Sequence, residues 1–155
     1  MANGLLQLVD WGPSGPYRSS LPSPYKELEE GIVNGKPKEV QAAIDNGADI
    51  NAKIVSRNGN SSIAWRVMYT HRYEKTEIMV ILLENGLKIT EELGYKLWVW
   101  SWEIPQAPYI DVMKALIKRG IKHDPANHPP FWLLEKDIQA EILECIEEYE
   151  RKRRL

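Results

Sequence analysis

Apolar and polar positions follow a helical period in three stretches of the chain, and each stretch ends in a glycine. Counted back from Gly47, Gly86 and Gly120, the residues seven, four and three positions earlier are all apolar. These residues are Val40, Ala43 and Ile44 in the first stretch, Met79, Leu82 and Leu83 in the second, and Met113, Leu116 and Ile117 in the third. Positions with this spacing share one face of an α-helix. The pattern therefore predicts three amphipathic helices, each closed by a glycine in the left-handed conformation.

The spacing of these glycines indicates an internal repeat of an inner helix, a turn and an outer helix. They are separated by 39 and 34 residues, which fits a period of about 33 residues with an insertion in the second repeat. We expect inner helices near Tyr25 to Asn34, Ser62 to Tyr73 and Thr90 to Glu103, outer helices near Pro37 to Asn46, Lys75 to Asn85 and Ile110 to Arg119, and a last helix from Lys136 to Arg153. Pro37 suits the first position of a helix. Thr90, followed by two acidic residues, suits an N-cap.

The first repeat resembles the ankyrin repeat family. Its second helix ends in the sequence Gly47-Ala48-Asp49-Ile50-Asn51, and Gly35 precedes Gly47 by twelve residues, as in that family. The resemblance is best over residues 35–51 and weaker over 78–89 and 112–121, and the T-P-L-H start of the family is not clearly present in any repeat. It implies an all-α fold: an ankyrin-like helical solenoid of about three to four repeats, with a hairpin-like finger in the insertion at residues 52–61 and a C-terminal capping helix.

The two ends of the chain differ from this repeat pattern. Residues 1–24 form an arm rich in Pro, Gly and Ser, which excludes regular helix over most of its length. We expect part of the arm to pack on the rest of the chain or on a partner, because it carries several apolar side chains, among them Trp11 and Tyr17. Residues 25–155 are expected to form the repeat domain, with its cap from about residue 129. The predicted last helix has one apolar side and many charges on the other, as a cap requires.

Composition limits the kinds of partner. The chain has 20 Lys and Arg against 22 Asp and Glu, a formal net charge of -2, so its overall charge does not favour nucleic acid or an anionic membrane. Cys145 is the single cysteine, follows the apolar pattern of the last helix, and is expected to be buried in a protein of a reducing compartment. No stretch of the sequence is apolar enough to be a signal peptide or to span a bilayer. We therefore expect a cytoplasmic protein without membrane contacts.

Aromatic residues provide the candidate binding surface, since the chain contains six Trp and seven Tyr but one Phe. Helical spacing groups Trp65, Tyr69 and Tyr73, and then Tyr95, Trp98 and Trp102. Such stripes are also typical of a core, but a helix cannot bury Trp98, Trp100 and Trp102 on one side, so at least one ring should lie near solvent. Asn58-Gly59 favours a hairpin turn in the finger. The candidate partner-binding residues are Arg57, Asn58, Trp65, Arg66, Tyr69, Tyr95, Trp98 and Trp102.

No pattern in the sequence indicates catalysis. The three histidines, His71, His123 and His128, do not form a zinc pattern with Cys145. Phosphate loops, dinucleotide glycine patterns, nucleophile elbows and paired catalytic carboxylates are not found. We therefore expect neither enzyme activity nor a cofactor, a metal ion or a small-molecule substrate.

The function expected from the sequence is binding to another protein, by occlusion or scaffolding. An inhibitor, immunity or counter-defence role belongs to this class. The alternative is a structural component of a larger assembly that is anchored by the arm at residues 1–24. Nucleic-acid binding through the basic residues Arg151 to Arg154 is less well supported, because cations at the end of a helix also complement its dipole.

Overall fold

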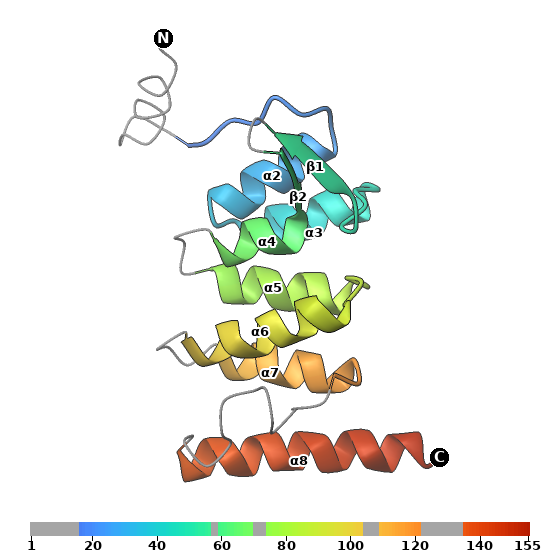
Figure 1. Ribbon diagram of the computed structural model, residues 1–155. Helices are drawn as coiled ribbons and strands as arrows, with labels where there is room; N and C mark the ends of the chain where they lie inside the picture. Colours follow the sequence, from blue (N-terminus) through green and yellow to red (C-terminus); the bar gives the residue numbers. More distant parts are fainter. Residues whose placement is uncertain (1–15, 57–58, 70–73, 104–108, 122–134) are drawn as a thin grey trace. The chain divides into compact units, whose positions relative to one another are not determined.

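The computed structural model describes residues 16–56, 59–69, 74–103, 109–121 and 135–155 (Figure 1). Side chains are described within these ranges except at 54–61 and 101–109. The helices of the described chain are α2 (Tyr25–Val33), α3 (Pro37–Asp45), α4 (Ile63–Met68), α5 (Lys75–Glu84), α6 (Glu91–Glu103), α7 (Tyr109–Lys118) and α8 (Lys136–Arg153). Strands β1 (Lys53–Ser56) and β2 (Gly59–Ser62) form an antiparallel hairpin between α3 and α4. The described fold is thus helical, apart from this hairpin.

Most helices begin and end within a residue or two of their predicted bounds. Pro37 is the first residue of α3, and the hydroxyl of Thr90 accepts a hydrogen bond from the amide of Leu93 at 3.1 Å. The second inner helix is the exception, because α4 ends at Met68 instead of Tyr73. Past Met68 the sequence is Tyr-Thr-His-Arg-Tyr, which offers no aliphatic side chain that would bury another helical turn. Residues 70–73 lie outside the described residues.

The hairpin is present in the predicted finger, but Gly59 lies in strand β2 instead of in the predicted Asn58-Gly59 turn. Ser56 pairs with Gly59, and Lys53 pairs with Ser62. Residues 57 and 58 lie outside the described residues. Ser62 ends β2 and is also the N-cap of α4, where its hydroxyl accepts a hydrogen bond from the amide of Trp65 at 3.3 Å. Because β2 runs directly into this cap, we attribute the register of the hairpin to the start of α4.

The same glycine cap closes four of the helices. The capping glycines all have a positive φ: Gly35 (67°), Gly47 (102°), Gly86 (91°) and Gly120 (81°). At the end of α3 the amide of Gly47 donates to the carbonyl of Ile44, and the amide of Ala48 donates to that of Ala43, both at 3.0 Å. This pair of bonds is the Schellman arrangement, which satisfies the last carbonyls of a helix. The predicted left-handed caps at Gly47, Gly86 and Gly120 are confirmed.

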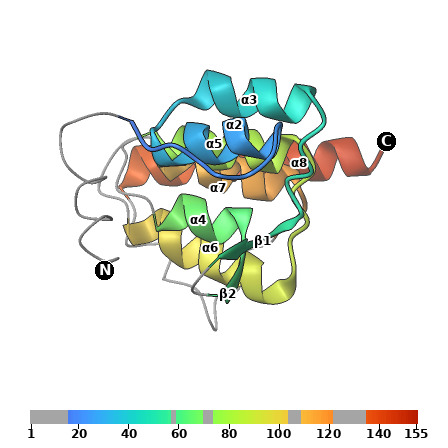
Figure 2. The same ribbon diagram turned by 90° about the horizontal axis from the view of Figure 1, so that it is seen from above.

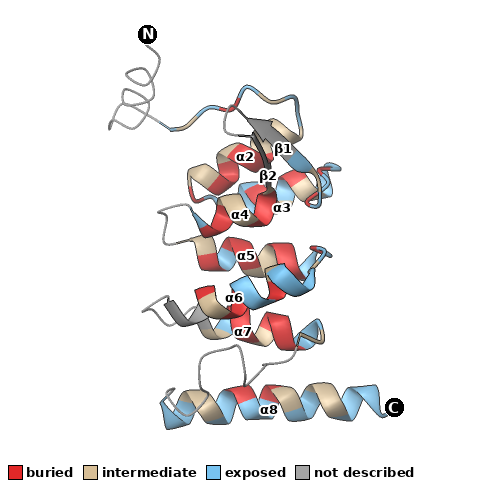
Figure 3. Ribbon diagram, in the orientation of Figure 1, coloured by how far each residue is buried: buried red, intermediate tan, exposed pale blue. Residues whose placement is uncertain are grey.

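The described chain divides into two compact units, residues 1–78 and residues 79–155. In the first unit α2 packs against α3 and α4, and β2 packs against α4; the view from above shows α3 beside α2 (Figure 2). In the second unit α7 packs against both α6 and α8. Figure 3 shows both buried and exposed positions on α3, α6, α7 and α8, whereas the residues of α2 and α4 are all buried or intermediate in exposure. Fully buried side chains include Leu28, Ile32, Val40, Ile63 and Val67 in the first unit, and Leu97, Met113 and Leu116 in the second. None of the described helices combines the length and the apolar character needed to cross a bilayer.

Candidate interaction surface

Two of the predicted aromatic contact residues form a stacked pair of which one ring is exposed. Trp65 and Tyr69 lie one turn apart on α4, with ring centroids 5.6 Å apart and planes inclined by 10°. The side chain of Trp65 is half-buried, whereas Tyr69 is 71% exposed at the end of the helix. Stacking on Trp65 therefore holds a large aromatic ring in position at the surface.

The aromatic residues of α6 are divided between the surface and the core. Tyr95 is 42% exposed, but Trp98 is only 3% exposed and Trp100 is also buried. The buried face of α6 is centred on Leu97, so the two tryptophans lie on either side of it and both pack inward. Trp98 is therefore a core residue in this structure, and its burial gives no support to its prediction as a contact residue. The side chain of Trp102 lies outside the described residues.

The predicted basic and polar contacts do not gather around the aromatic pair. Arg57 and Asn58 lie outside the described residues. Arg66 forms an ion pair within the chain, with its Nη1 atom 2.5 Å from Oε2 of Glu29. Its guanidinium thus has a role within the chain, because it neutralises a carboxylate that would otherwise be buried without a countercharge. Its role as a partner contact stays a prediction.

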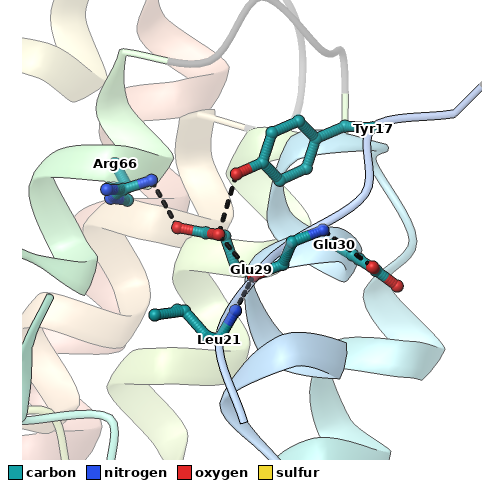
Figure 4. Close-up of polar contacts among 6 residues, drawn as sticks. Tyr17, Leu21, Glu29, Glu30 and Arg66 are labelled. Carbon is teal, nitrogen blue, oxygen red and sulfur yellow. Dashed lines mark hydrogen bonds and ion pairs between the residues drawn. The ribbon is translucent and has the colours of Figure 1, made fainter. Parts of the chain in front are cut away.

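Glu29 is the centre of a polar cluster that the sequence analysis missed (Figure 4). Its side chain is only 5% exposed. One carboxylate oxygen accepts hydrogen bonds from the hydroxyl of Tyr17 at 2.8 Å and from that of Ser19 at 2.6 Å. The other oxygen accepts the bond from Arg66 of α4. The charge is thus paired and both oxygens are bonded, which is what makes burial of a carboxylate tolerable.

The chain before α2 is tied to the same helix through its backbone. The side-chain amide of Asn34 accepts a hydrogen bond from the amide of Tyr17 at 2.8 Å and donates one to the carbonyl of Tyr17 at 3.0 Å. The amide of Ser19 donates to a carboxylate oxygen of Glu30 at 2.8 Å. As the chain proceeds from residue 17 to residue 23, its partners move back from Asn34 to Glu27. The segment therefore runs antiparallel to α2.

This environment changes the acidity of Tyr17. Burial, the hydrogen bond to Glu29 and the negative charge of that carboxylate raise the pKa of Tyr17 to about 12. The positive charge of Arg66 opposes this rise in pKa, whereas the negative charge of Glu30 adds to it. The phenol therefore remains protonated, and remains a donor to Glu29, over the whole physiological range.

A local sign of this cluster exists in the sequence, but it is weak. Glu29 occupies a position on α2 whose neighbours three and four residues later, Ile32 and Val33, are apolar. An acidic residue there indicates a buried charge that needs partners. The partners themselves come from 12 and 37 residues away, which helical periodicity cannot identify.

Among the other titratable groups considered in the sequence, Cys145 belongs to the described residues, whereas His71, His123 and His128 lie outside them. Cys145 is buried on α8, where its thiol lies 3.9 Å from the carbonyl of Lys114, and burial raises its pKa. Within the described ranges no three His, Cys, Asp or Glu side chains gather as they would around a metal ion. Comparison with protein-family models, with curated proteins and with solved structures finds no match.

Proposed function

We propose that this chain is an ankyrin-like helical-repeat protein that binds a protein partner without catalysing a reaction. The recurrence of one helix cap at Gly35, Gly47, Gly86 and Gly120 supports the repeat assignment. Inner helices α2 and α6 pack against the outer helices α3 and α7 that follow them, as helix pairs of a repeat protein do. Repeat proteins of this kind act through extended surfaces that contact other macromolecules.

The stacked pair of Trp65 and the exposed Tyr69 is the observation that carries the binding proposal. Most of the Tyr69 ring is exposed to solvent, yet its orientation is fixed by stacking. A rigid aromatic ring loses little conformational entropy on binding and buries a large area, so Trp and Tyr are enriched among the residues that dominate protein interfaces. We infer that a partner covers this pair. Occlusion of a partner's own binding surface is the simplest consequence.

The structural-component alternative has less support. Its anchor was expected in the arm at residues 1–24, and within the described part of that arm Tyr17 and Ser19 are bonded to α2 of the same chain. The basic residues at the end of α8 also have local roles, since Lys152 pairs with Glu148 at 3.1 Å and Arg153 lies over the ring of Tyr149. No contact in the described chain specifically favours nucleic acid.

Affinity capture from the native cells tests the binding proposal. We expect Tyr69→Ala to reduce recovery of the specific partner at least tenfold, as substitution of a central aromatic contact does. Leu143→Ala is the matched control, because Leu143 is an exposed apolar side chain of α8, away from the aromatic pair in sequence. Circular dichroism establishes that both variants keep the helical content. Equal recovery with both variants contradicts the proposed surface.

A further inference from the structure

Helix α2 and its C-cap bind the backbone of Tyr17 and Ser19 in the manner of a peptide receptor. Asn34 pairs with both the amide and the carbonyl of Tyr17, and Glu30 accepts the amide of Ser19. These three bonds are made by side chains of the helix and its C-cap to main-chain groups of an extended segment. Any extended peptide offers the same groups, so this part of the recognition does not depend on the sequence that is bound.

The buried carboxylate of Glu29 adds selectivity for side chains. It accepts hydrogen bonds from two hydroxyls, those of Tyr17 and Ser19, and therefore selects hydroxyl-bearing residues two positions apart. Hydrogen bonds to an ionised acceptor are stronger than those between neutral groups. Arg66 contacts the other carboxylate oxygen from α4, so Glu29 has a partner outside the bound segment that keeps it in position. The site is thus preorganised for a Tyr-X-Ser sequence.

Only one residue of the bound segment is buried. Ser19 is buried, but Arg18, Ser20 and Pro22 are not, and Tyr17 is only partly buried. A short segment attached mainly by polar bonds binds weakly by itself and depends on its covalent connection, which gives it a high effective concentration. A second segment with the same groups can therefore compete for the site.

We propose that Glu29, Glu30 and Asn34 form a binding site on α2 for an extended Tyr-X-Ser segment of a partner protein, and that residues 17–21 occupy this site as an internal ligand. Displacement of the internal ligand frees the N-terminal arm when the partner binds. This site goes beyond the proposed function, because it uses residues other than Trp65 and Tyr69 and recognises a different feature of a partner.

Fluorescence anisotropy with a labelled peptide of residues 16–22 tests the site. The full chain serves as receptor in the wild-type form and in an opened form that carries Tyr17→Ala and Ser19→Ala. We expect the opened form to bind the peptide at least tenfold more tightly than wild type, because in wild type the site is free for only a small fraction of the time. If the double variant loses helical content, the single variant Tyr17→Ala serves as a milder opened form.

Two controls make the test specific. Adding Asn34→Ala to the opened form is expected to weaken peptide binding about tenfold, since two hydrogen bonds to the peptide backbone are lost. A peptide with alanine at the positions of Tyr17 and Ser19 is expected to bind at least tenfold more weakly than the original. If the folded opened forms do not distinguish the two peptides, the proposal is overturned.

The remaining outcomes distinguish the α2 site from self-association of the chain and from the aromatic surface of Trp65 and Tyr69. Size exclusion with light scattering tests whether the wild type forms a dimer as its concentration increases. A dimer that is abolished by Asn34→Ala would identify the segment of a second copy as the occupant. This result would overturn the proposal of a foreign partner. Tyr69→Ala is expected to leave peptide binding unchanged. The proposal of the aromatic surface and the proposal of the α2 site are therefore tested, and can each be contradicted, in different experiments.

Discussion

Residues 17–21 are held on α2 by hydrogen bonds to one buried carboxylate and its neighbours, whereas α8 is held on α7 mainly by apolar packing. The bonds from Tyr17, Ser19 and Arg66 to Glu29 are directional and involve its charge. On α8 the buried side chains are Ile142 and Cys145, and its ion pair to α7, between Lys114 and Glu141, is accessible to solvent. The first arrangement concentrates its stability in a single group. The second distributes it over a surface, where no single charge is essential.

The largest effect is expected from removing the countercharge of Glu29. Arg66→Met leaves the carboxylate buried without its ion pair, which is expected to lower the free energy of unfolding by about 3 kcal/mol. Lys114→Met, which breaks the accessible pair to Glu141, is expected to cost less than about 1 kcal/mol. Urea denaturation followed by circular dichroism measures both. Similar losses in the two variants would show that Glu29 does not depend on Arg66.

Removing apolar packing from α8 is expected to have the second-largest effect. Ile142→Ala deletes most of a buried side chain on the apolar face of α8 and is expected to lower the free energy of unfolding by about 2.5 kcal/mol. Leu143→Ala, at the exposed neighbouring position, is expected to change stability by less than about 0.5 kcal/mol. The same denaturation experiment applies. If Ile142→Ala were as mild as Leu143→Ala, packing would not be what holds α8.

The sequence predicts the helices well because their signals are local. Apolar residues three, four and seven positions before Gly47 define a face, and the glycine defines where the helix ends. Pro37 and Thr90 mark helix starts for equally local reasons, since one lacks an amide hydrogen and the other supplies a capping hydroxyl. Interactions within one or two turns decide each of these features, so residue order is sufficient.

The candidate site is less predictable because it depends on contacts between distant segments. Spacing groups Tyr95 with Trp98, but the packing of α6 buries the second ring and exposes the first. Spacing also leaves open whether Arg66 faces a partner or the chain itself. Only the fold brings Glu29 beside it. Trp65 and Tyr69 were grouped by their spacing of one helical turn, and their stacking follows from it. Which of the two rings is exposed could not be predicted from that spacing.

Alanine substitutions at Gly120 and Gly47 distinguish backbone strain from a contact with α8. The alanine in Gly120→Ala must adopt a φ of +81°, and its Cβ lies 2.9 Å from the hydroxyl oxygen of Tyr149. At Gly47, where φ is +102°, nothing lies within 4 Å of an added Cβ. We expect losses of about 2 kcal/mol and about 1 kcal/mol, respectively. Thermal denaturation measures the difference. Tyr149→Phe should remove it in the Gly120→Ala background, and an unchanged difference would exclude the hydroxyl as its cause.

The smallest effect at neutral pH, and the one most specific to the polar attachment, concerns Tyr17. Tyr17→Phe is expected to cost about 1 kcal/mol at pH 7, because one hydrogen bond to Glu29 is lost. The wild type should lose this advantage at high pH. Burial and the nearby charges of Glu29 and Glu30, opposed by Arg66, raise the pKa of Tyr17 from 10.0 to about 12 in the folded chain.

The sign of this pH effect follows from proton binding. Above pH 10 the unfolded chain loses the proton of Tyr17 while the folded chain keeps it until about pH 12, so unfolding releases a proton and stability falls as the pH rises through this window. Denaturation of wild type and Tyr17→Phe at matched pH values isolates the contribution of Tyr17, because the other groups titrate in both proteins. The difference in stability should be constant below pH 10 and shrink between pH 10 and 12. A difference that persists unchanged to the end of this window would mean that folding does not raise the pKa of Tyr17 and that its hydrogen bond to Glu29 is not formed as described. The polar attachment would then rest on Ser19 and the backbone bonds to Asn34 and Glu30.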